Sequence, residues 1–297
     1  MSVREFSVLM MICLIWGFHF VVMKITVQDT AEPLFYAAIR MSIVGIILLP
    51  KLKWHKDVMP WVLAAGACYA GFNYAFAFPA LTMTTASAAS VAFELYVPFS
   101  IILSVLVFKD RIGLPKITGI ALAFLGVALV AMAKPEETPG ALFLLGIAMI
   151  AAGAFSEAVG AIIVKKVTGV GPYQLLAWFA VVGSCMLWPL TLTLESNQLD
   201  AFKGDNLMPF ILALIYSVFA VSIIAHASYY WLLQRLPIYI VATGGLISPI
   251  FAVIGGVLLL GEPISPQLLL GGALTFIGVG LILWRNRIKA IEEPSTI

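Results

Sequence analysis

The residues best suited to carry chemistry in this chain are a few ionisable side chains that interrupt long apolar stretches. They are His19, Arg40, Glu94, Glu157 and His226. An ionisable group inside a bilayer is costly unless it faces a cavity or a partner. A carboxyl group in a cavity binds a solute's ammonium group or carries a proton, and histidine relays protons near neutral pH. These types therefore indicate solute recognition and proton transfer.

Glu94 is the strongest of these candidates. It shares a weakly polar helical face with Ser87 and Pro98, in the middle of an apolar stretch. Pro98 removes one backbone hydrogen bond and frees a carbonyl group near Glu94, where a polar ligand can bind. The alternative is a structural pair with Arg40 or a histidine. We predict that Glu94 binds a cationic group or carries a coupling proton.

Glu157 and Arg40 leave more than one interpretation open. Glu157 lies among small residues, so it either faces the cavity or forms a hydrogen bond across a helix interface. Arg40 lies nearer the outer third of its span, where it either snorkels outward or pairs with Glu94 or Glu157. A structural role is favoured for Arg40.

Aromatic residues accompany both histidines. Trp16 and His19 are three residues apart and share a helix face, and His226 precedes Tyr230 by four residues. Each histidine is either part of the solute path or a neutral core residue. We include Trp16, His19, His226 and Tyr230 among the candidate substrate-binding residues.

Tyr69 and Asn73 give the third candidate group, because residues four apart share one face of an α-helix. The same spacing predicts that Phe72 and Phe76 extend this face, whereas Tyr74 reaches its edge at best. A buried amide needs a partner, so the Asn73 side is predicted to face inward and to bind a small organic solute. The alternative is an aromatic belt at the membrane interface.

The composition identifies the elements that must hold these residues. Of 297 residues, 62% are hydrophobic and 11% charged, against roughly a quarter charged in soluble domains. The apolar stretches have the length that crosses a bilayer. They predict an all-α membrane protein with ten spans, at residues 5–25, 32–50, 58–80, 86–108, 114–133, 140–164, 171–194, 208–233, 238–260 and 266–285.

The distribution of positive charge predicts the orientation. With the N-terminus inside, the inner segments hold thirteen Lys and Arg residues. The outer segments hold Lys24, Lys134 and Lys203. Cytoplasmic loops carry this excess, so we expect both termini in the cytoplasm and the chain in the cell's inner or plasma membrane. A net charge of +2 indicates no nucleic-acid partner.

The two halves of the chain resemble each other. Residues 112–130 align without gaps to residues 264–282, so that Gly126 matches Gly278, and slightly upstream Pro98 matches Pro249. Ser248, just before Pro249, marks the ninth span as the counterpart of the fourth and is a further binding candidate. An odd number of spans per half makes the repeat inverted, which is typical of carriers. We predict repeats at 1–134 and 139–285 around a central cavity, with a cytoplasmic tail at 286–297.

Several motifs together resemble the EamA family of the drug/metabolite transporter superfamily. They are Trp16-Gly17 with Lys24, Arg40, Lys165-Lys166, and an acidic turn before a Gly-rich helix in each half, at Asp110 and Glu262. The resemblance implies ten helices, with helices 1, 3, 4, 6, 8 and 9 around the cavity and helices 5 and 10 peripheral. It is nearest to bacterial exporters of amino acids and metabolites such as cysteine and O-acetylserine. This chain departs from that pattern at Glu157, where many relatives have Trp, and at Glu94, where those exporters carry an amide.

The resulting hypothesis is a secondary transporter, not an enzyme, that moves a neutral or zwitterionic metabolite by alternating access, as an exporter. The alternative is an importer or facilitator of a sugar, a nucleotide or a drug-like cation. The partners expected are the solute, the bilayer and protons as a candidate coupling ion, in a monomer or homodimer. No HExxH, GxSxG or Walker motif and no metal-ligand spacing occurs, so neither a cofactor nor a metal is expected.

Overall fold

The chain forms a bundle of membrane-spanning helices. The computed structural model describes residues 2–108, 113–133, 138–233, 236 and 244–292. In this part of the chain, eight helical segments are long and apolar enough to cross a membrane, and two shorter apolar helices, Pro33–Ile47 and Leu246–Leu260, complete the ten predicted spans. The prediction of an all-α membrane protein with ten spans is confirmed.

The first half contains five spans, of which the third and fourth are each divided into shorter helical segments. Its elements are α1 (Val3–Asp29), α2 (Pro33–Ile47), α3 (Met59–Gly66), the π-helix η2 (Ala67–Phe72), α4 (Asn73–Met83), α5 (Ala86–Phe93), α6 (Tyr96–Phe108) and α7 (Leu114–Ala131). Proline lies in the first turn of α2, α3 and α7, where its missing N–H group costs no hydrogen bond.

The second half repeats this order. Its elements are α8 (Gly140–Val164), α9 (Pro172–Leu194), α10 (Leu207–Ile215), the π-helix η5 (Tyr216–Ala225), α11 (His226–Leu233), α13 (Gly244–Leu260) and α14 (Pro266–Glu292). The π-helices η2 and η5 therefore occupy the third span of each half. Such segments are rare and occur frequently at functional sites.

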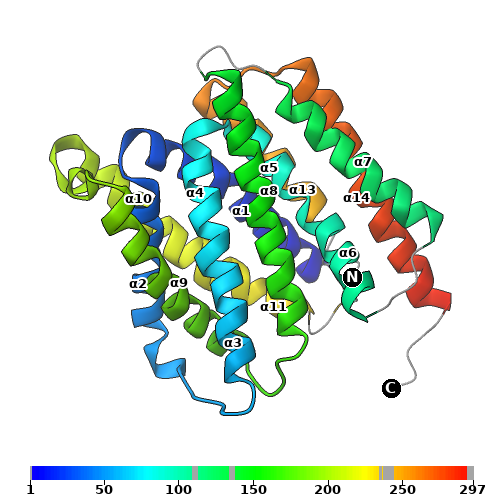
Figure 1. The fold of residues 1–297 in the computed structure, drawn as a ribbon, viewed down its shortest axis with the longest axis horizontal. Coiled ribbons are helices and arrows are strands. Elements are labelled where there is room, and N and C mark those ends of the chain that lie inside the picture. The colour runs from blue at the N-terminus through cyan, green and yellow to red at the C-terminus, as the bar shows by residue number, and fades with distance from the viewer. Residues whose placement is uncertain (1, 109–112, 134–137, 234–235, 237–243, 293–297) are drawn as a thin grey trace.

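The last span of each half packs against the other at one edge of the bundle, where α7 and α14 lie side by side (Figure 1). A Cβ atom on Gly126 would lie 2.5 Å from the carbonyl oxygen of Gly271, and one on Gly278 would lie 2.5 Å from that of Gly119. Gly119 is the repeat counterpart of Gly271, and Gly126 is that of Gly278. The contact is therefore reciprocal, as an approximate two-fold axis between inverted repeats requires.

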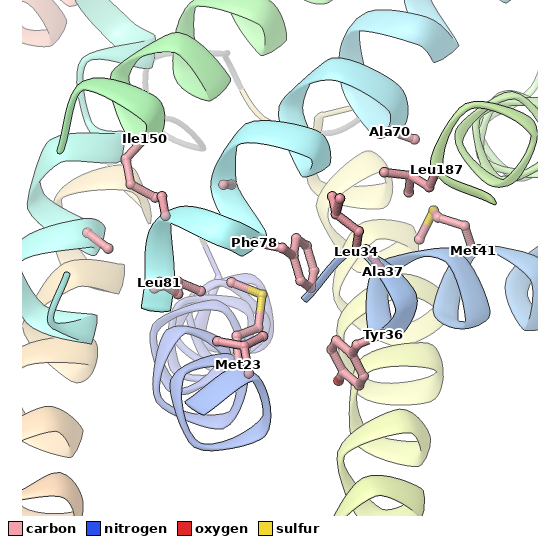
Figure 2. Packing of buried hydrophobic residues seen from close by; sticks show 14 of the residues in the cluster. Met23, Leu34, Tyr36, Ala37, Met41, Ala70, Phe78, Leu81, Ile150 and Leu187 are labelled. Carbon is pink, nitrogen blue, oxygen red and sulfur yellow. The ribbon is translucent and has the colours of Figure 1, made fainter. Parts of the chain in front are cut away.

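The rest of the bundle packs around a continuous apolar core. Phe78 of α4 lies between Met23 of α1 and Leu34 of α2, so this ring joins the first three spans (Figure 2). The paired helices α2 and α9 form the opposite side of the molecule from α7 and α14 (Figure 1). The interior thus leaves the polar residues of α1, α2, α4, α8 and α11 grouped in the centre.

Glu195 joins the two halves by capping a helix that lies far from it in sequence. Its carboxylate accepts hydrogen bonds from the backbone N–H groups of Leu34 (2.7 Å) and Phe35 (2.9 Å), at the start of α2. The neighbouring acid Glu32 is the N-cap residue of this helix but forms no side-chain cap hydrogen bond.

Replacing Glu195 with alanine is expected to lower the free energy of unfolding by about 1 kcal/mol, because two N–H groups of α2 lose their acceptor. The measurement is the melting temperature of the purified protein in detergent. Glu32→Ala is the matched control and should leave that temperature nearly unchanged. Equal effects of the two substitutions would contradict the capping role of Glu195.

Candidate functional site

Arg40 forms the centre of the first of two polar groups inside the bundle. Its side chain is only 1% exposed. One terminal nitrogen lies 2.8 Å from Nε2 of His19, and the other donates to the hydroxyl group of Ser222 at 3.2 Å. The guanidinium carbon lies 5.3 Å from the centre of the Tyr74 ring. A guanidinium group only donates hydrogen bonds, so Nε2 of His19 is the acceptor and its Nδ1 carries the proton.

Trp16 and His226 complete this group. Their rings lie 5.4 Å apart between centroids in a T-shaped arrangement. Nδ1 of His226 lies 2.7 Å from the carbonyl oxygen of Val221, which only accepts, so this ring nitrogen is the donor. We call Trp16, His19, Arg40, Ser222 and His226 the guanidinium half-site.

Glu157 forms the centre of the second polar group. Its carboxyl group accepts a hydrogen bond of 2.5 Å from the side-chain amide of Asn73. One turn earlier, the ring of Tyr69 stacks on Phe179 at 5.3 Å between centroids. Gly160 leaves space for this ring, since a Cβ atom there would lie 2.7 Å from it. We call Tyr69, Asn73, Glu157 and Phe179 the carboxyl half-site.

The two half-sites occupy corresponding positions of the two repeats. Asn73 directly follows η2 and His226 directly follows η5. Their partners correspond as well, because Glu157 and Trp16 each precede a lysine, Lys165 or Lys24, by eight residues.

The second contact of each half-site obeys the same relation. Tyr69 lies four residues before Asn73, and Ser222 lies four residues before His226. The partner of Tyr69 is Phe179, seven residues after Pro172, which begins α9. The partner of Ser222 is Arg40, seven residues after Pro33, which begins α2. The inverted repeat therefore places corresponding contacts in both half-sites, although the residue types differ. Glu157 supplies a carboxyl group to one half-site, and Arg40 supplies a guanidinium group at a different position of the other.

Glu94 lies at a break in the fourth span. Helix α5 ends at Phe93 and α6 begins at Tyr96. Pro98 has no N–H group for the Glu94 carbonyl oxygen, which accepts instead from the N–H group of Val97 at 3.1 Å. The prediction of a freed carbonyl group at this point is therefore wrong, because the Glu94 carbonyl oxygen accepts a hydrogen bond in the short turn between α5 and α6. The Glu94 side chain is 8% exposed and forms no hydrogen bond with the described residues, and its carboxyl group is near enough to Glu157 to interact with it electrostatically.

Two tyrosines show that the half-sites adjoin each other. Tyr74 follows Asn73 in sequence, yet its ring contacts Arg40 of the other half-site. The ring of Tyr229 lies 5.2 Å from that of Trp16, and its hydroxyl group is within electrostatic range of Glu157. The polar side chains of both repeats therefore form one central site.

Most of the predicted binding residues lie in this central site. The structure brings together Trp16, His19, Tyr69, Asn73, Glu94, Glu157 and His226. The hydroxyl group of Ser248 donates to the carbonyl oxygen of Cys13 at 3.1 Å, where α13 packs on α1. The side chain of Tyr230 lies outside the described part. A role in binding stays a prediction for each of these residues.

Two details of the sequence analysis are wrong. Phe72 and Phe76 do not extend the Tyr69–Asn73 face, because they are 49% and 38% exposed on the outside of the bundle. The spacing rule assumed a regular α-helix, whereas η2 adds a residue to the turn at this point. Arg40 pairs with neither Glu94 nor Glu157, since the ion pair found among the described residues joins Lys203 to Asp200. Arg40 is held instead by His19 and Ser222.

Sequence reasoning also missed Ser222, Tyr74 and Phe179 as members of the site, and it gave Arg40 a structural role. Ser222 and Phe179 have ordinary residue types for a membrane helix, so composition alone does not distinguish them. The signal that would have found them is the repeat, because the counterparts of Tyr69 and Arg40 are Ser222 and Phe179.

Hydrogen bonds join helices from both halves at the end of the bundle opposite the N-terminus. The carboxylate of Glu262 accepts from the backbone N–H groups of Ala86 (2.5 Å) and Ser87 (3.0 Å), at the start of α5. The Lys24 ammonium group donates to the carbonyl oxygen of Leu81 at 2.7 Å. We call these contacts the clasp. Its predicted counterpart, Asp110, lies outside the described residues.

The end of the bundle near the N-terminus is hollowed. A pocket of about 300 Å³ lies there between α1, α9 and α11, lined by Arg4, Val8, Tyr173, Ser228 and Trp231. The guanidinium group of Arg4 lies 5.5 Å from the centre of the Trp231 ring. The two ends of the bundle thus differ, with the clasp at one and an open pocket at the other.

The chemistry of the central site fits a small organic solute. It offers carboxyl groups, a guanidinium group, hydroxyl groups and aromatic rings, which together recognise polar organic molecules. Among the residues that the structure describes, no group of three or more His, Cys, Asp or Glu side chains is placed to hold a metal ion.

Comparisons with known proteins identify the family to which this architecture belongs. The model of the EamA-like transporter family matches residues 5–132 and again 144–284. Two curated relatives are described as probable amino-acid metabolite efflux pumps. The one from Salmonella typhimurium is 26% identical over 99% of this chain and 100% of its own length, and the one from Escherichia coli K12 is 26% identical over 97% and 99%.

Two further matches agree in length and fold. An uncharacterized transporter of Archaeoglobus fulgidus is 26% identical over 94% of this chain and 99% of its own length. A solved crystal structure aligns with 97% of this chain and 100% of its own, with a TM-score of 0.64 and 16% identity. At this identity the structural likeness concerns the fold alone.

Proposed function

Because the chain belongs to the EamA-like transporter family, we propose that it is a secondary transporter of a small amino-acid-like metabolite, working by alternating access as an exporter. The observation that carries this proposal is the central site, in which two corresponding half-sites adjoin each other, one with the carboxyl group of Glu157 and the other with the guanidinium group of Arg40. Neutral or zwitterionic amino acids carry charges of both signs, so they complement such a site. The direction of transport rests on the description of the relatives.

The proposed division into repeats is 1–134 and 139–285, with a tail at 286–297. Rocking of the two repeats about the approximate two-fold axis would expose the central site to either side in turn. With both termini in the cytoplasm of a cell whose inner or plasma membrane holds the protein, the clasp lies outside and the pocket beside Arg4 inside. The described conformation is then closed to the outside.

The substrate-binding residues that we propose are Trp16, His19, Tyr69, Asn73, Glu94, Glu157 and His226, with Tyr230 and Ser248 as further candidates. Glu94 is the leading candidate for cation recognition or proton coupling, because its buried carboxyl group has no hydrogen-bond partner among the described residues. Neither a metal nor a cofactor is required.

Counterflow in liposomes tests this function. Vesicles containing the purified protein are loaded with an unlabelled mixture of the standard L-amino acids, and uptake of a labelled trace of the same mixture is followed. We expect saturable uptake that transiently exceeds equilibrium, because a carrier exchanges solute across the membrane. A channel gives no such overshoot. Absence of counterflow with amino acids would overturn the amino-acid proposal, and a parallel test with sugars and nucleotides addresses the alternative.

A further inference from the structure

We propose that Trp16, His19 and Arg40 form a subsite for the carboxylate of the transported solute, whose ammonium group lies against Glu157 and Glu94. This inference rests on the proposed function and deepens it. It specifies that both charges of a zwitterion are recognised, each by a different polar group of the central site. It also changes the role of Arg40 from structural to ligand-binding.

The first argument is a set of buried hydrogen-bond donors without acceptors. Nε1 of Trp16, Nδ1 of His19 and Nε of Arg40 are all buried and have no hydrogen-bond partner among the residues that the structure describes. The indole and guanidinium nitrogens only donate, and Nδ1 of His19 carries its proton because Nε2 accepts from Arg40. A buried donor without a partner is costly, so three of them on neighbouring side chains indicate a missing acceptor.

The second argument is the charge of Arg40. A buried guanidinium group is normally paired with an anion, because removing it from water is costly. Arg40 contacts a neutral imidazole, a hydroxyl group and the face of Tyr74, and the hydroxyl groups of Tyr36 and Tyr216 are within electrostatic range of it. None of them carries a negative charge. The missing acceptor is therefore an anion, and carboxylate is a preferred partner of guanidinium.

The third argument is the complementary arrangement at Glu157 of the carboxyl half-site and at the neighbouring Glu94. Glu157 accepts one hydrogen bond, from Asn73, and Glu94 accepts none from the described residues. Two carboxyl groups that can accept more hydrogen bonds complement an ammonium group, which has three donors and no acceptor. Tyr74 and Tyr229 each lie next to both half-sites, which therefore adjoin each other, as recognition of both charges of one small molecule requires.

The same features favour a carboxylate over a phosphate group. Arg40 is the one permanently charged cation of the central site among the described side chains, since His19 is neutral. A phosphate dianion would call for additional Lys or Arg side chains. A single carboxylate is balanced by one guanidinium group, with the N–H groups of Trp16 and His19 as further donors.

Selective loss of an N–H donor gives the sharpest test. Trp16→Phe removes the unpartnered indole N–H group but keeps an aromatic ring against His226 and Tyr229. Trp188→Phe is the matched control, because the indole N–H group of Trp188 already donates to Ser42 at 3.0 Å, away from the central site. Arg40→Gln removes the cation. If Arg40→Gln fails to fold, the Trp16→Phe variant still tests the inference.

The measurement is thermal stabilisation of the purified full-length protein by three mixtures. One contains the standard L-amino acids, the second their carboxamides, which lack the carboxylate, and the third their N-acetyl derivatives, which lack the ammonium group. We expect the unmodified protein to bind amino acids at least about tenfold more tightly than carboxamides, given the strength of a charge-assisted hydrogen bond. Trp16→Phe and Arg40→Gln should reduce that preference, whereas Trp188→Phe should keep it.

The outcomes distinguish failure of the carboxylate subsite from failure of the proposed function. If amino acids support counterflow but carboxamides bind equally well, the carboxylate subsite is wrong and the proposed function stands. If Trp16→Phe leaves the preference unchanged, the free N–H groups are satisfied by water only and the inference is overturned. If amino acids neither stabilise the protein nor support counterflow, the proposed function itself fails and this inference fails with it.

Discussion

Glu94→Gln is expected to slow amino-acid counterflow about 10- to 100-fold while leaving the melting temperature equal or higher. The slower transport follows from the loss of a charged acceptor for the solute's ammonium group, since a hydrogen bond to a charged group contributes about 1.5–3 kcal/mol. The unchanged or higher stability follows from the burial of Glu94, which forms no hydrogen bond with the described residues. Replacing an unpaired buried carboxyl group with an amide removes a desolvation cost.

The opposite signs of these two effects separate a functional role from a structural one. If Glu94 stabilised the fold through a partner, the glutamine variant would lose stability together with transport. Asp200→Asn is the matched control, because it makes the same chemical change in an exposed ion pair with Lys203. Counterflow rates of the Glu94 variant equal to those of the control would show that Glu94 has no part in transport.

The same variant addresses proton coupling. If the Glu94 carboxyl group carries the coupling proton, the transport rate of the unmodified protein depends on pH through that group, and glutamine removes the dependence. Counterflow measured across a range of pH with both proteins distinguishes this from simple ammonium recognition. A pH profile retained by Glu94→Gln assigns the coupling to another group.

Gly126→Ala is expected to destabilise the protein by about 1–3 kcal/mol, the cost typical of overpacking. A Cβ atom there would lie 2.5 Å from the carbonyl oxygen of Gly271 and 2.6 Å from the backbone nitrogen of Thr275, so α7 and α14 would have to separate. The hydroxyl oxygen of Thr275 also lies against this position, but the other two obstacles are backbone atoms, which cannot move aside by changing a rotamer. Close approach through small residues is a main source of helix association in membranes.

Gly272→Ala is the matched control for this prediction. Gly272 adjoins Gly271 in α14, yet the nearest atom to a Cβ there is a methyl carbon of Val91 at 3.8 Å, an ordinary contact. The melting temperature of the Gly272→Ala variant should equal or exceed that of the unmodified protein, since alanine is a better helix former than glycine. If both substitutions lower the melting temperature equally, the effect comes from the loss of glycine as such and the seam model is wrong.

The fold was predictable because the bilayer imposes strong rules on sequence. Spans must be apolar over about twenty residues, so their number and approximate bounds followed from composition. The Gly126/Gly278 and Pro98/Pro249 matches predicted an inverted repeat, and the reciprocal packing of α7 on α14 agrees with it. Near Pro98 the helix is interrupted between α5 and α6, but the carbonyl group predicted to be free accepts from the N–H group of Val97.

The site was predictable only as a set of candidates. Glu157, His19 and Asn73 attracted attention because polar side chains are rare in apolar spans, and that reasoning holds for single residues. It does not say which residues meet. The contact of Glu157 with Asn73 joins α8 to α4, and the contact of Arg40 with His19 joins α2 to α1. Such pairings depend on helix packing and rotation.

By itself, the sequence determined that this protein crosses a membrane ten times as two related halves, because hydrophobic length and repeated Gly and Pro positions are local properties of the chain. Only the tertiary structure decided that Arg40 belongs to the central site and that Phe72 and Phe76 do not. The π-helices change which side chains share a face, and they form where spans from both halves pack together. Glu157 and Arg40 are far apart in sequence, and only the packing of the two repeats against each other places them in adjoining half-sites.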